Sequence, residues 1–144
     1  MISLKQVDTT NFWEVIEQSV GKEQENLVLN NAVSIAQAYV QPECIPLAIY
    51  KEDTLVGFAM YCIDTDDGEY WIYRLMIDQH YQGKGYGKLA LEALINRIKE
   101  NKSKNKILLG VHLDGKAAVH LYQSMGFEFT GQVFGQEYIM ELHY

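Results

Sequence analysis

The chain has 144 residues, of which 48% are hydrophobic, so its length and composition predict one domain (residues 1–144) with a real core and exclude a disordered chain. The net charge of −7 argues against a nucleic-acid partner, because nucleic-acid binders carry a basic face, whereas an acidic surface attracts cationic partners. Cys44 and Cys62 lack the spacing of a zinc or redox motif, and there is neither a membrane-length apolar run nor a signal peptide, so we expect a cytoplasmic protein without metal or membrane.

The first half of the chain predicts a strand, two helices and three further strands. Apolar and polar residues alternate over 2–7, as they do in a half-buried strand. Asp8–Asn11 supplies N-cap residues for the first helix. The elements expected after this point are a short helix that begins with residues 12–17 and ends near Gly21, a polar loop at 22–31 with a turn of helix, a helix at 32–39, and strands at 45–50, 54–64 and 70–78. Asp and Gly in the turns between these strands are typical of hairpins.

The second half predicts a helix, a buried strand, another helix and a closing hairpin. Apolar residues at 91, 94, 95 and 98 are spaced by three and four, which places them on one face of a helix over 85–101. The apolar run at 107–111 is nearly continuous, as in a strand that is buried on both faces. The remaining expected elements are a helix at 117–125, closed by Gly126, and strands at 127–134 and 136–143.

Three alternate glycines, Gly83, Gly85 and Gly87, lie between the strand at 70–78 and the helix that follows it. Glycine permits unusual dihedral angles and lets another group approach the main chain closely. A tight loop that leads into a helix also gathers unpaired N–H donors at the positive end of the helix dipole. Such a site binds phosphate, and Lys84 and Lys88 add positive charge beside it, so we interpret the junction as a pyrophosphate-binding loop.

Three kinds of glycine loop compete for this junction, besides an ordinary turn between strand and helix. A Walker loop requires Ser or Thr after Gly-Lys, but Leu89 follows Lys88. A dinucleotide fingerprint requires Gly-x-Gly-x-x-Gly, whereas the spacing here is Gly-x-Gly-x-Gly. The third pattern, Gln/Arg-x-x-Gly-x-Gly/Ala, fits the run from Gln82 to Gly87 without adjustment. It is the acetyl-coenzyme A signature of the GNAT N-acetyltransferases, which this chain resembles.

A second segment carries the same resemblance. The chain reads Ala-x-x-Leu-Tyr-x-x-x-Gly-Phe over residues 118–127, which is similar to a segment of the GNAT family, and the expected elements follow the family's order. The resemblance implies an α/β (α+β) acyl-CoA N-acyltransferase fold with a mixed sheet of about seven strands and four helices. Residues 57–61 and 81–88 resemble the bacterial spermine/spermidine (diamine) N-acetyltransferases most closely. This implies a cytoplasmic homodimer that moves acetyl from acetyl-CoA, as cosubstrate, to a primary amine of a polyamine.

The resemblance also implies roles for individual residues. Leu75, Met76 and Ile77 would present backbone groups to the pantetheine arm, much like an added strand. The main-chain amides of the loop would bind the pyrophosphate, and the residues concerned are Gln82, Gly83, Lys84, Gly85, Tyr86, Gly87 and Lys88. Tyr122 would be the general acid that protonates the departing thiolate. Gly115 stands where the family often has an asparagine, so that pantetheine contact would be absent or would come from another group, such as Asp114 or backbone.

The chemistry leaves the base and the acceptor open. A thioester reacts only with a neutral amine, whereas free amines of polyamines are mostly protonated at neutral pH, like lysine with its pKa of about 10.4. The candidate proton routes are Glu69, Asp78, or waters bridged by Tyr70 and Tyr73. Tyr122 is a suitable acid, but it also lies on an apolar helix stripe that is typical of core packing. Two other hypotheses remain: an acetyltransferase for another amine, such as a protein N-terminus or an amino sugar, and a coenzyme-binding module with weak or no turnover.

Overall fold

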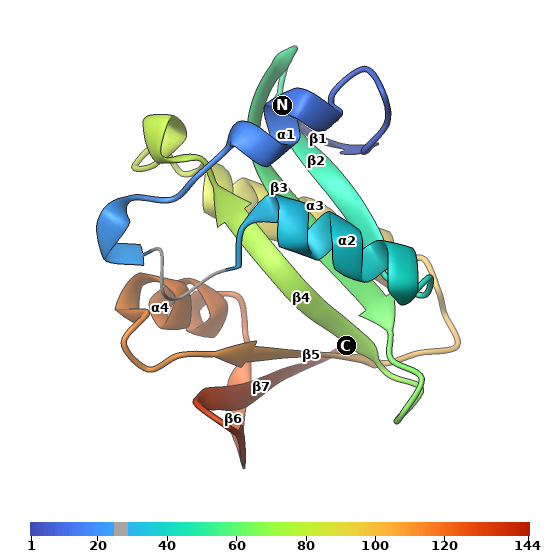
Figure 1. Ribbon diagram of the computed structural model, residues 1–144. Coiled ribbons are helices and arrows are strands. Elements are labelled where there is room, and N and C mark those ends of the chain that lie inside the picture. The colour runs from blue at the N-terminus through green and yellow to red at the C-terminus, as the bar shows by residue number, and fades with distance from the viewer. Residues whose placement is uncertain (25–28) are drawn as a thin grey trace.

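The computed structural model describes residues 1–24 and 29–144 of the chain (Figure 1). The elements, in which η marks a 3-10 helix, are β1 (Ile2–Gln6), α1 (Phe12–Glu17), η1 (Lys22–Gln24), α2 (Asn31–Val40), β2 (Ile45–Lys51), β3 (Thr54–Ile63), β4 (Tyr70–Ile77), η2 (Gln79–Tyr81), α3 (Tyr86–Lys99), β5 (Lys106–Val111), α4 (Lys116–Ser124), β6 (Glu128–Phe134) and β7 (Glu137–His143). The bounds of the predicted strands and helices agree with these to within two residues, except that α1 ends at Glu17 and not near Gly21, because Gln18 already has extended backbone; η2 was not predicted. Within the predicted loop at 22–31, η1 is the expected turn of helix, and residues 25–28 lie outside the described residues.

The strands form one seven-stranded sheet in the order β1-β2-β3-β4-β5-β7-β6. The β4–β5 pair is parallel and the other neighbours are antiparallel, so the sheet is mixed. Together with the four α-helices of the described residues, this confirms the fold class that the resemblance implied. None of the helices in this described part is long and apolar enough to cross a membrane.

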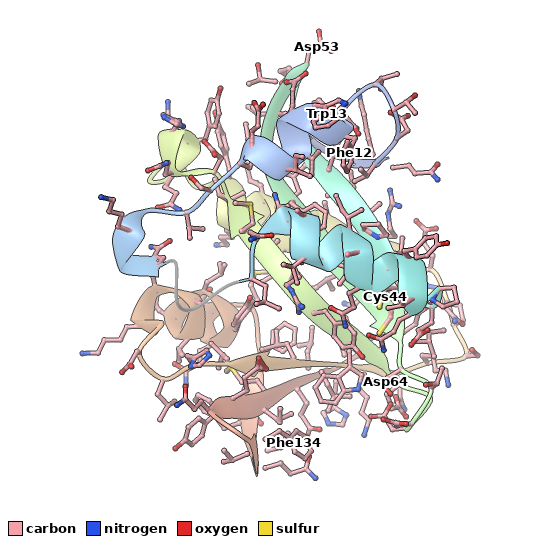
Figure 2. The ribbon with its side chains drawn as sticks, in the orientation of Figure 1. Phe12, Trp13, Cys44, Asp53, Asp64 and Phe134 are labelled. Carbon is pink, nitrogen blue, oxygen red and sulfur yellow. The ribbon has the colours of Figure 1, made fainter. Side chains whose placement is uncertain are left out.

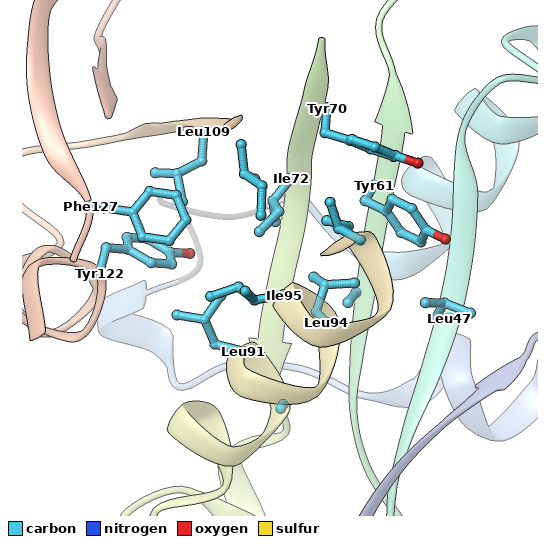
Figure 3. Packing of buried hydrophobic residues seen from close by; sticks show 14 of the residues in the cluster. Leu47, Tyr61, Tyr70, Ile72, Leu91, Leu94, Ile95, Leu109, Tyr122 and Phe127 are labelled. Carbon is cyan, nitrogen blue, oxygen red and sulfur yellow. The ribbon is translucent and has the colours of Figure 1, made fainter. Parts of the chain in front are cut away.

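Helices cover both faces of the sheet, with α1 and α2 on one face and α3 on the other (Figure 1). The helix face predicted from the three-and-four spacing is confirmed: Leu91, Leu94, Ile95 and Ile98 are all buried. Figure 3 shows Leu91, Leu94 and Ile95 of α3 packed toward the sheet. Burying one such side chain contributes about 1.5–3 kcal/mol, so the α3 face supplies much of the stability of this layer.

The face under α1 and α2 has a smaller apolar cluster. It includes Val15 of α1, Phe58 and Met60 of β3, and Met76 of β4. Gly57 lets β3 approach β4 here, because a Cβ at this position would collide with the main-chain carbonyl of Met76. The close approach therefore fixes β3 against the carboxyl-terminal end of β4, which is the part of the sheet that borders the candidate site.

A β-bulge at Tyr73 changes the course of β4. Met60 of β3 pairs with Arg74, but the next residue of β3 pairs with Ile72, so Tyr73 has no counterpart on β3. Such an extra residue bends its strand and increases its twist. The parallel pairing of β4 with β5 ends at the same point, at Ile72 and Leu109. Beyond it the two strands diverge (Figure 1), so the sheet is open between them on the side of α4.

Candidate active site

A cleft of about 1110 Å³ lies where β4 and β5 diverge. Three parts of the chain form most of its wall: the end of β4, the glycine loop that leads into α3, and the segment from the end of β5 into α4. Val20, Gln24 and Leu29 add a fourth part from the N-terminal segment. The opening between the strands thus becomes a channel that runs from the glycine loop to the point where β4 and β5 separate.

The glycine loop forms the entrance of this channel. Gly83 and Gly85 have φ angles of 78° and 82°, in the left-handed region that favours glycine, and a Cβ on either would meet nothing within 4 Å. Among the described residues no group accepts a hydrogen bond from the amides of residues 85–88, and the first amide of the helix that donates is that of Leu89, to the Gly85 carbonyl at 3.3 Å. Open space and free donors at a helix N-terminus fit a diphosphate.

Gln82 attaches this loop to its surroundings. Its side-chain amide donates to the carbonyl of Ile77 at 3.0 Å and to Oε1 of Gln24 at 3.2 Å. The loop is therefore fixed against both the end of β4 and the N-terminal segment. The side chains of Lys84 and Lys88 are exposed beside the loop and lie outside the cleft lining, whereas the other residues predicted for the pyrophosphate all line the cleft.

Leu75, Met76 and Ile77 also line the cleft. One edge of this stretch of β4 pairs with residues 57–59 of β3. The opposite edge has no strand partner in the described residues, because β5 has already diverged. Backbone N–H and C=O groups on an unpaired edge can bind an extended, amide-containing chain as an additional strand would. The geometry therefore fits the pantetheine arm, whose contact with these residues stays a prediction.

Tyr122 reaches the cleft from α4, on the α3 side of the sheet. The residue is 9% exposed, and its ring packs edge-on against Phe127 with 5.8 Å between ring centroids. Figure 3 shows its oxygen directed toward β4. No group among the described residues forms a hydrogen bond with this oxygen, and burial raises the pKa of Tyr122 to about 12. The hydroxyl is therefore protonated at neutral pH and free to donate.

The start of α4 accommodates the departure noted at Gly115. Gly115 lies before the helix without a side-chain cap, and its amide donates to the His112 carbonyl at 3.0 Å. Asp114 and Gly115 both line the cleft, as do the first residues of α4. The pantetheine contact expected from Asp114 or from backbone at this point stays a prediction.

Most of the proton routes named from the sequence lie outside the cleft lining. Asp78 is 5% exposed and its carboxylate accepts hydrogen bonds from the amides of Ser19 at 3.0 Å and His80 at 3.1 Å, which is a structural role. Glu69 and Tyr70 do not line the cleft, but Tyr73 does. The Tyr73 hydroxyl donates to Asp64 at 2.7 Å, and Figure 2 places Asp64 at the end of β3. Burial and this hydrogen bond raise the pKa of Tyr73, so Tyr73 stays neutral.

Two charged residues of the cleft were missed by sequence reasoning. Arg74 donates from β4 to Ser34 at 3.1 Å and to Gln37 at 2.8 Å on α2. Burial lowers the pKa of Arg74, and the negative charge of Glu137 on β7 opposes that effect. Neither residue belongs to a recognisable motif. Only the pairing of β5 with β7, which is a long-range property, brings Glu137 to the cleft.

Comparison with known proteins agrees with this geometry. A sequence model described as the acetyltransferase (GNAT) family matches residues 8–127. The spermine/spermidine N(1)-acetyltransferase of Bacillus subtilis (strain 168) is 34% identical over 146 residues, which cover 96% of this chain and 96% of that protein. Similar solved structures include the spermidine N-acetyltransferase from Vibrio cholerae in complex with CoA and spermine (TM-score 0.74, 14% identity, 97% of this chain and 92% of that one). Another is AAC(6')-Ib in complex with paromomycin and acetyl-CoA (TM-score 0.82, 17% identity, 99% of this chain and 93% of that one).

The structural likenesses, at these identities, concern the fold, whereas the family match covers most of the chain and the Bacillus subtilis relative nearly all of it. The glycine loop with its free amides and the open edge of β4 agree with acetyl-CoA as cosubstrate. The chain therefore belongs to the acetyltransferase (GNAT) family and is an acetyl-CoA-dependent N-acetyltransferase.

Proposed function

We propose that this protein transfers the acetyl group of acetyl-CoA to a primary amine of a polyamine, such as spermine or spermidine, by direct attack. The observation that carries the proposal is the 34% identity with the Bacillus subtilis spermine/spermidine N(1)-acetyltransferase across 96% of both chains. The net charge of −7 also favours a cationic acceptor, because an acidic surface raises the local concentration of cations.

In this proposal, acetyl-CoA supplies an acetyl thioester. The chain's own groups bind the coenzyme, align its thioester and protonate the departing sulfur. The free amides of residues 85–88 bind the diphosphate, and the unpaired edge of β4 aligns the arm that leads toward the bulge at Tyr73. An amide of β4 near Met76 or Ile77 stabilises the negative charge on the carbonyl oxygen. Tyr122 donates a proton to the departing sulfur, which its raised pKa of about 12 permits at neutral pH. No covalent bond to the enzyme is required.

The test is release of the coenzyme thiol with spermine and spermidine, compared with butylamine at the same concentration. We expect kcat/KM for the polyamines to exceed that for the monoamine by at least about tenfold, which corresponds to about 1.4 kcal/mol of additional recognition. Equal values for all amines, or preference for an amino sugar or a peptide N-terminus, would contradict the polyamine assignment. Binding of acetyl-CoA without thiol release from any amine would support a coenzyme-binding module instead.

We also propose a cytoplasmic homodimer. The hairpin of β6 and β7 ends the sheet, and Phe134 projects at its tip (Figure 2). The exposed apolar side chains on this hairpin are Phe129, Val133, Phe134 and Tyr138. A second copy that covers them would remove apolar area from water, which favours association. Sedimentation at micromolar concentration is the measurement, and a monomer at all concentrations would contradict the dimer.

A further inference from the structure

We propose that Glu137 is the general base, the carboxylate that removes the proton from the incoming ammonium group. This inference rests on the proposed function, because it names a further catalytic residue for the same amine transfer. It concerns a residue that no motif identifies and that lies on β7, outside both segments that carry the family resemblance.

The first support is that Glu137, although exposed, lines the cleft close to the point where β4 and β5 separate. The β4–β5 pairing ends with Ile72 and Leu109, so the next residue of β5, Gly110, marks the point where the strands separate. Gly110 and Glu137 both line the cleft there. If a diphosphate binds at the glycine loop and the arm follows β4 inward, the reactive end of the thioester arrives at this point. Glu137 then lies next to the reacting carbon and to the amine that attacks it.

The second support is the packing between Glu137 and Gly110. The position that a Cβ of residue 110 would take is 3.2 Å from both Cβ and Cδ of Glu137 and still closer to its Oε2. These three Glu137 atoms are the nearest neighbours of that position. Gly110 does not have a positive φ, so its backbone would accept a side chain. The glycine is therefore explained by the Glu137 carboxylate, which occupies the space above it.

The third support is that Glu137 and Tyr122 lie on opposite faces of the sheet. Successive residues of a strand point to opposite faces, and Leu109 belongs to the core cluster that contains Tyr122. The carboxylate above Gly110 is therefore on the other face, where α1 and α2 pack and where Arg74 bonds to α2. Attack on a thioester proceeds by addition of the amine to the carbonyl carbon and then loss of the sulfur, so the base must reach the nitrogen and the acid must reach the sulfur. The carboxylate and the tyrosine approach from different faces of the sheet, so each can serve one of these two atoms without crowding the other.

The fourth support is the charge environment of Glu137. Within residues 1–24 and 29–144, no salt bridge or hydrogen bond engages its carboxylate, in contrast to Asp64 and Asp78. Arg74, whose guanidinium is bonded to α2, lines the same cleft.

The proposed step balances as follows. The ammonium gives one proton to Glu137, which releases it to solvent, and the nitrogen lone pair then forms the C–N bond with the thioester carbonyl carbon. The C–S bond breaks as the sulfur takes the proton of Tyr122. The second proton of the nitrogen returns through water to Tyr122, so the products are the N-acetylated amine, the free thiol and one proton.

The test compares Glu137→Gln with the control Glu141→Gln. Glu141 lies four residues further along β7, outside the cleft lining, and pairs with His143 at 3.1 Å. We expect Glu137→Gln to lower kcat/KM for the amine by about 100-fold, since general base catalysis contributes about 10²–10⁴-fold. We expect the dissociation constant of acetyl-CoA, from calorimetry, to be unchanged in both variants and Glu141→Gln to be fully active. A loss of less than threefold in Glu137→Gln would overturn the proposal.

A second variant distinguishes a base from a residue needed only for packing. In the double variant Glu137→Ala with Gly110→Asp, an aspartate oxygen, two bonds beyond Cβ, reaches the space that Oε2 of Glu137 leaves. We expect the double variant to recover to within about tenfold of the original kcat/KM, while Glu137→Ala alone stays low. Failure of the folded double variant to exceed Glu137→Ala would contradict the proposal.

A series of acceptor amines of decreasing basicity gives an independent readout. Less basic amines arrive already neutral, so we expect the deficit of Glu137→Gln to shrink along the series. A constant deficit would indicate a positional role and contradict proton transfer. The series also separates this inference from the polyamine assignment: if monoamines react as well as spermine, the substrate class is wrong, and the role of Glu137 is still measured on those monoamines.

Discussion

The carboxylate of Asp78 accepts a hydrogen bond from the backbone amide of Ser19 at 3.0 Å and thereby joins the end of β4 to the N-terminal segment. Three further bonds strengthen this junction: the amide of Gln79 donates to the Ser19 carbonyl at 2.8 Å, its side chain donates to the Ser19 hydroxyl at 2.9 Å, and Gln82 donates to Gln24 at 3.2 Å. Because Val20 and Gln24 line the cleft, Asp78 fixes one wall of the site without lining it.

Asp78→Asn should therefore destabilise the fold in a pH-dependent way. Burial alone would raise the pKa of Asp78, but the hydrogen bonds from Ser19 and His80 outweigh burial and lower it below its ordinary value of 3.8. A lowered carboxylate pKa contributes stability above 3.8 and loses that contribution as the pH falls through the folded-state pKa. We expect a loss of about 1–3 kcal/mol in the free energy of unfolding at neutral pH.

Denaturant unfolding of both proteins at neutral pH and at a pH below 3.8 is the measurement for Asp78. The difference between the original protein and Asp78→Asn should narrow in acid, because the original carboxylate then becomes protonated as well. A difference that stays constant at both pH values would show that the charge of Asp78 contributes nothing.

Tyr122→Phe removes the proposed acid and leaves its packing against Phe127. We expect kcat to fall by about 100-fold, whereas the melting temperature should hardly change, because the hydroxyl has no hydrogen-bond partner among the described residues. The pKa of about 12 also predicts a pH effect. The protonated form is the active one, so this group should cause no alkaline loss of kcat up to about pH 10. Steady-state kinetics over that range is the test, and full turnover in Tyr122→Phe would refute the role.

Gly85→Ala and Gly87→Ala form a matched pair within the glycine loop. Gly85 has a φ of 82°, where a side chain costs about 1–2 kcal/mol. Gly87 lies in the first turn of α3, and its Cβ would meet Leu121 at 3.8 Å and Ile77 at 3.9 Å, which are ordinary contacts. We expect Gly85→Ala to weaken acetyl-CoA binding at least about tenfold and Gly87→Ala to leave it nearly unchanged. Calorimetry measures the dissociation constant of acetyl-CoA for both variants. Equal losses of affinity would contradict the idea that the left-handed backbone at Gly85 shapes the binding loop.

Lys84 and Lys88 should contribute to binding only through long-range charge. Both side chains are exposed and lie outside the cleft lining, and exposed ion pairs contribute about 0.2–1 kcal/mol. We therefore expect Lys84→Gln and Lys88→Gln each to raise the dissociation constant of acetyl-CoA by about two- to fivefold at low salt, and less at high salt. A loss that does not respond to salt would indicate direct hydrogen bonds to the coenzyme instead.

The sequence was most informative where one local rule decided the structure. The three-and-four spacing of apolar residues in α3 predicted its buried face, and the three glycines predicted a loop with unusual dihedral angles, which Gly83 and Gly85 adopt. The order of elements along the chain, read from the residue patterns, then matched the family's order and so predicted the fold class. The sequence did not reveal that Asp78 caps η2 by accepting a hydrogen bond from the amide of His80. From the sequence alone, Asp78 could not be distinguished from the last residue of the strand.

The parts of the site that could not be predicted depend on contacts between distant segments. Glu137 reaches Gly110 only because β7 pairs with β5, and Arg74 finds Ser34 and Gln37 only because α2 crosses β4. No pattern of residue spacing along the chain predicts these long-range contacts. Tyr73 appeared in the sequence as one aromatic residue of a strand, and nothing in its neighbourhood marked it as the additional residue of a bulge.

That additional residue has a consequence for how the enzyme tolerates change. Because the bulge and the end of the β4–β5 pairing coincide, we expect the gap to depend on the one residue more that β4 has than β3, and not on the chemistry of the Tyr73 side chain. Replacing Tyr73 by another strand-forming residue should leave the gap open. Deleting it would restore the count, allow the two parallel strands to continue their ladder, and seal the route by which the acyl donor enters.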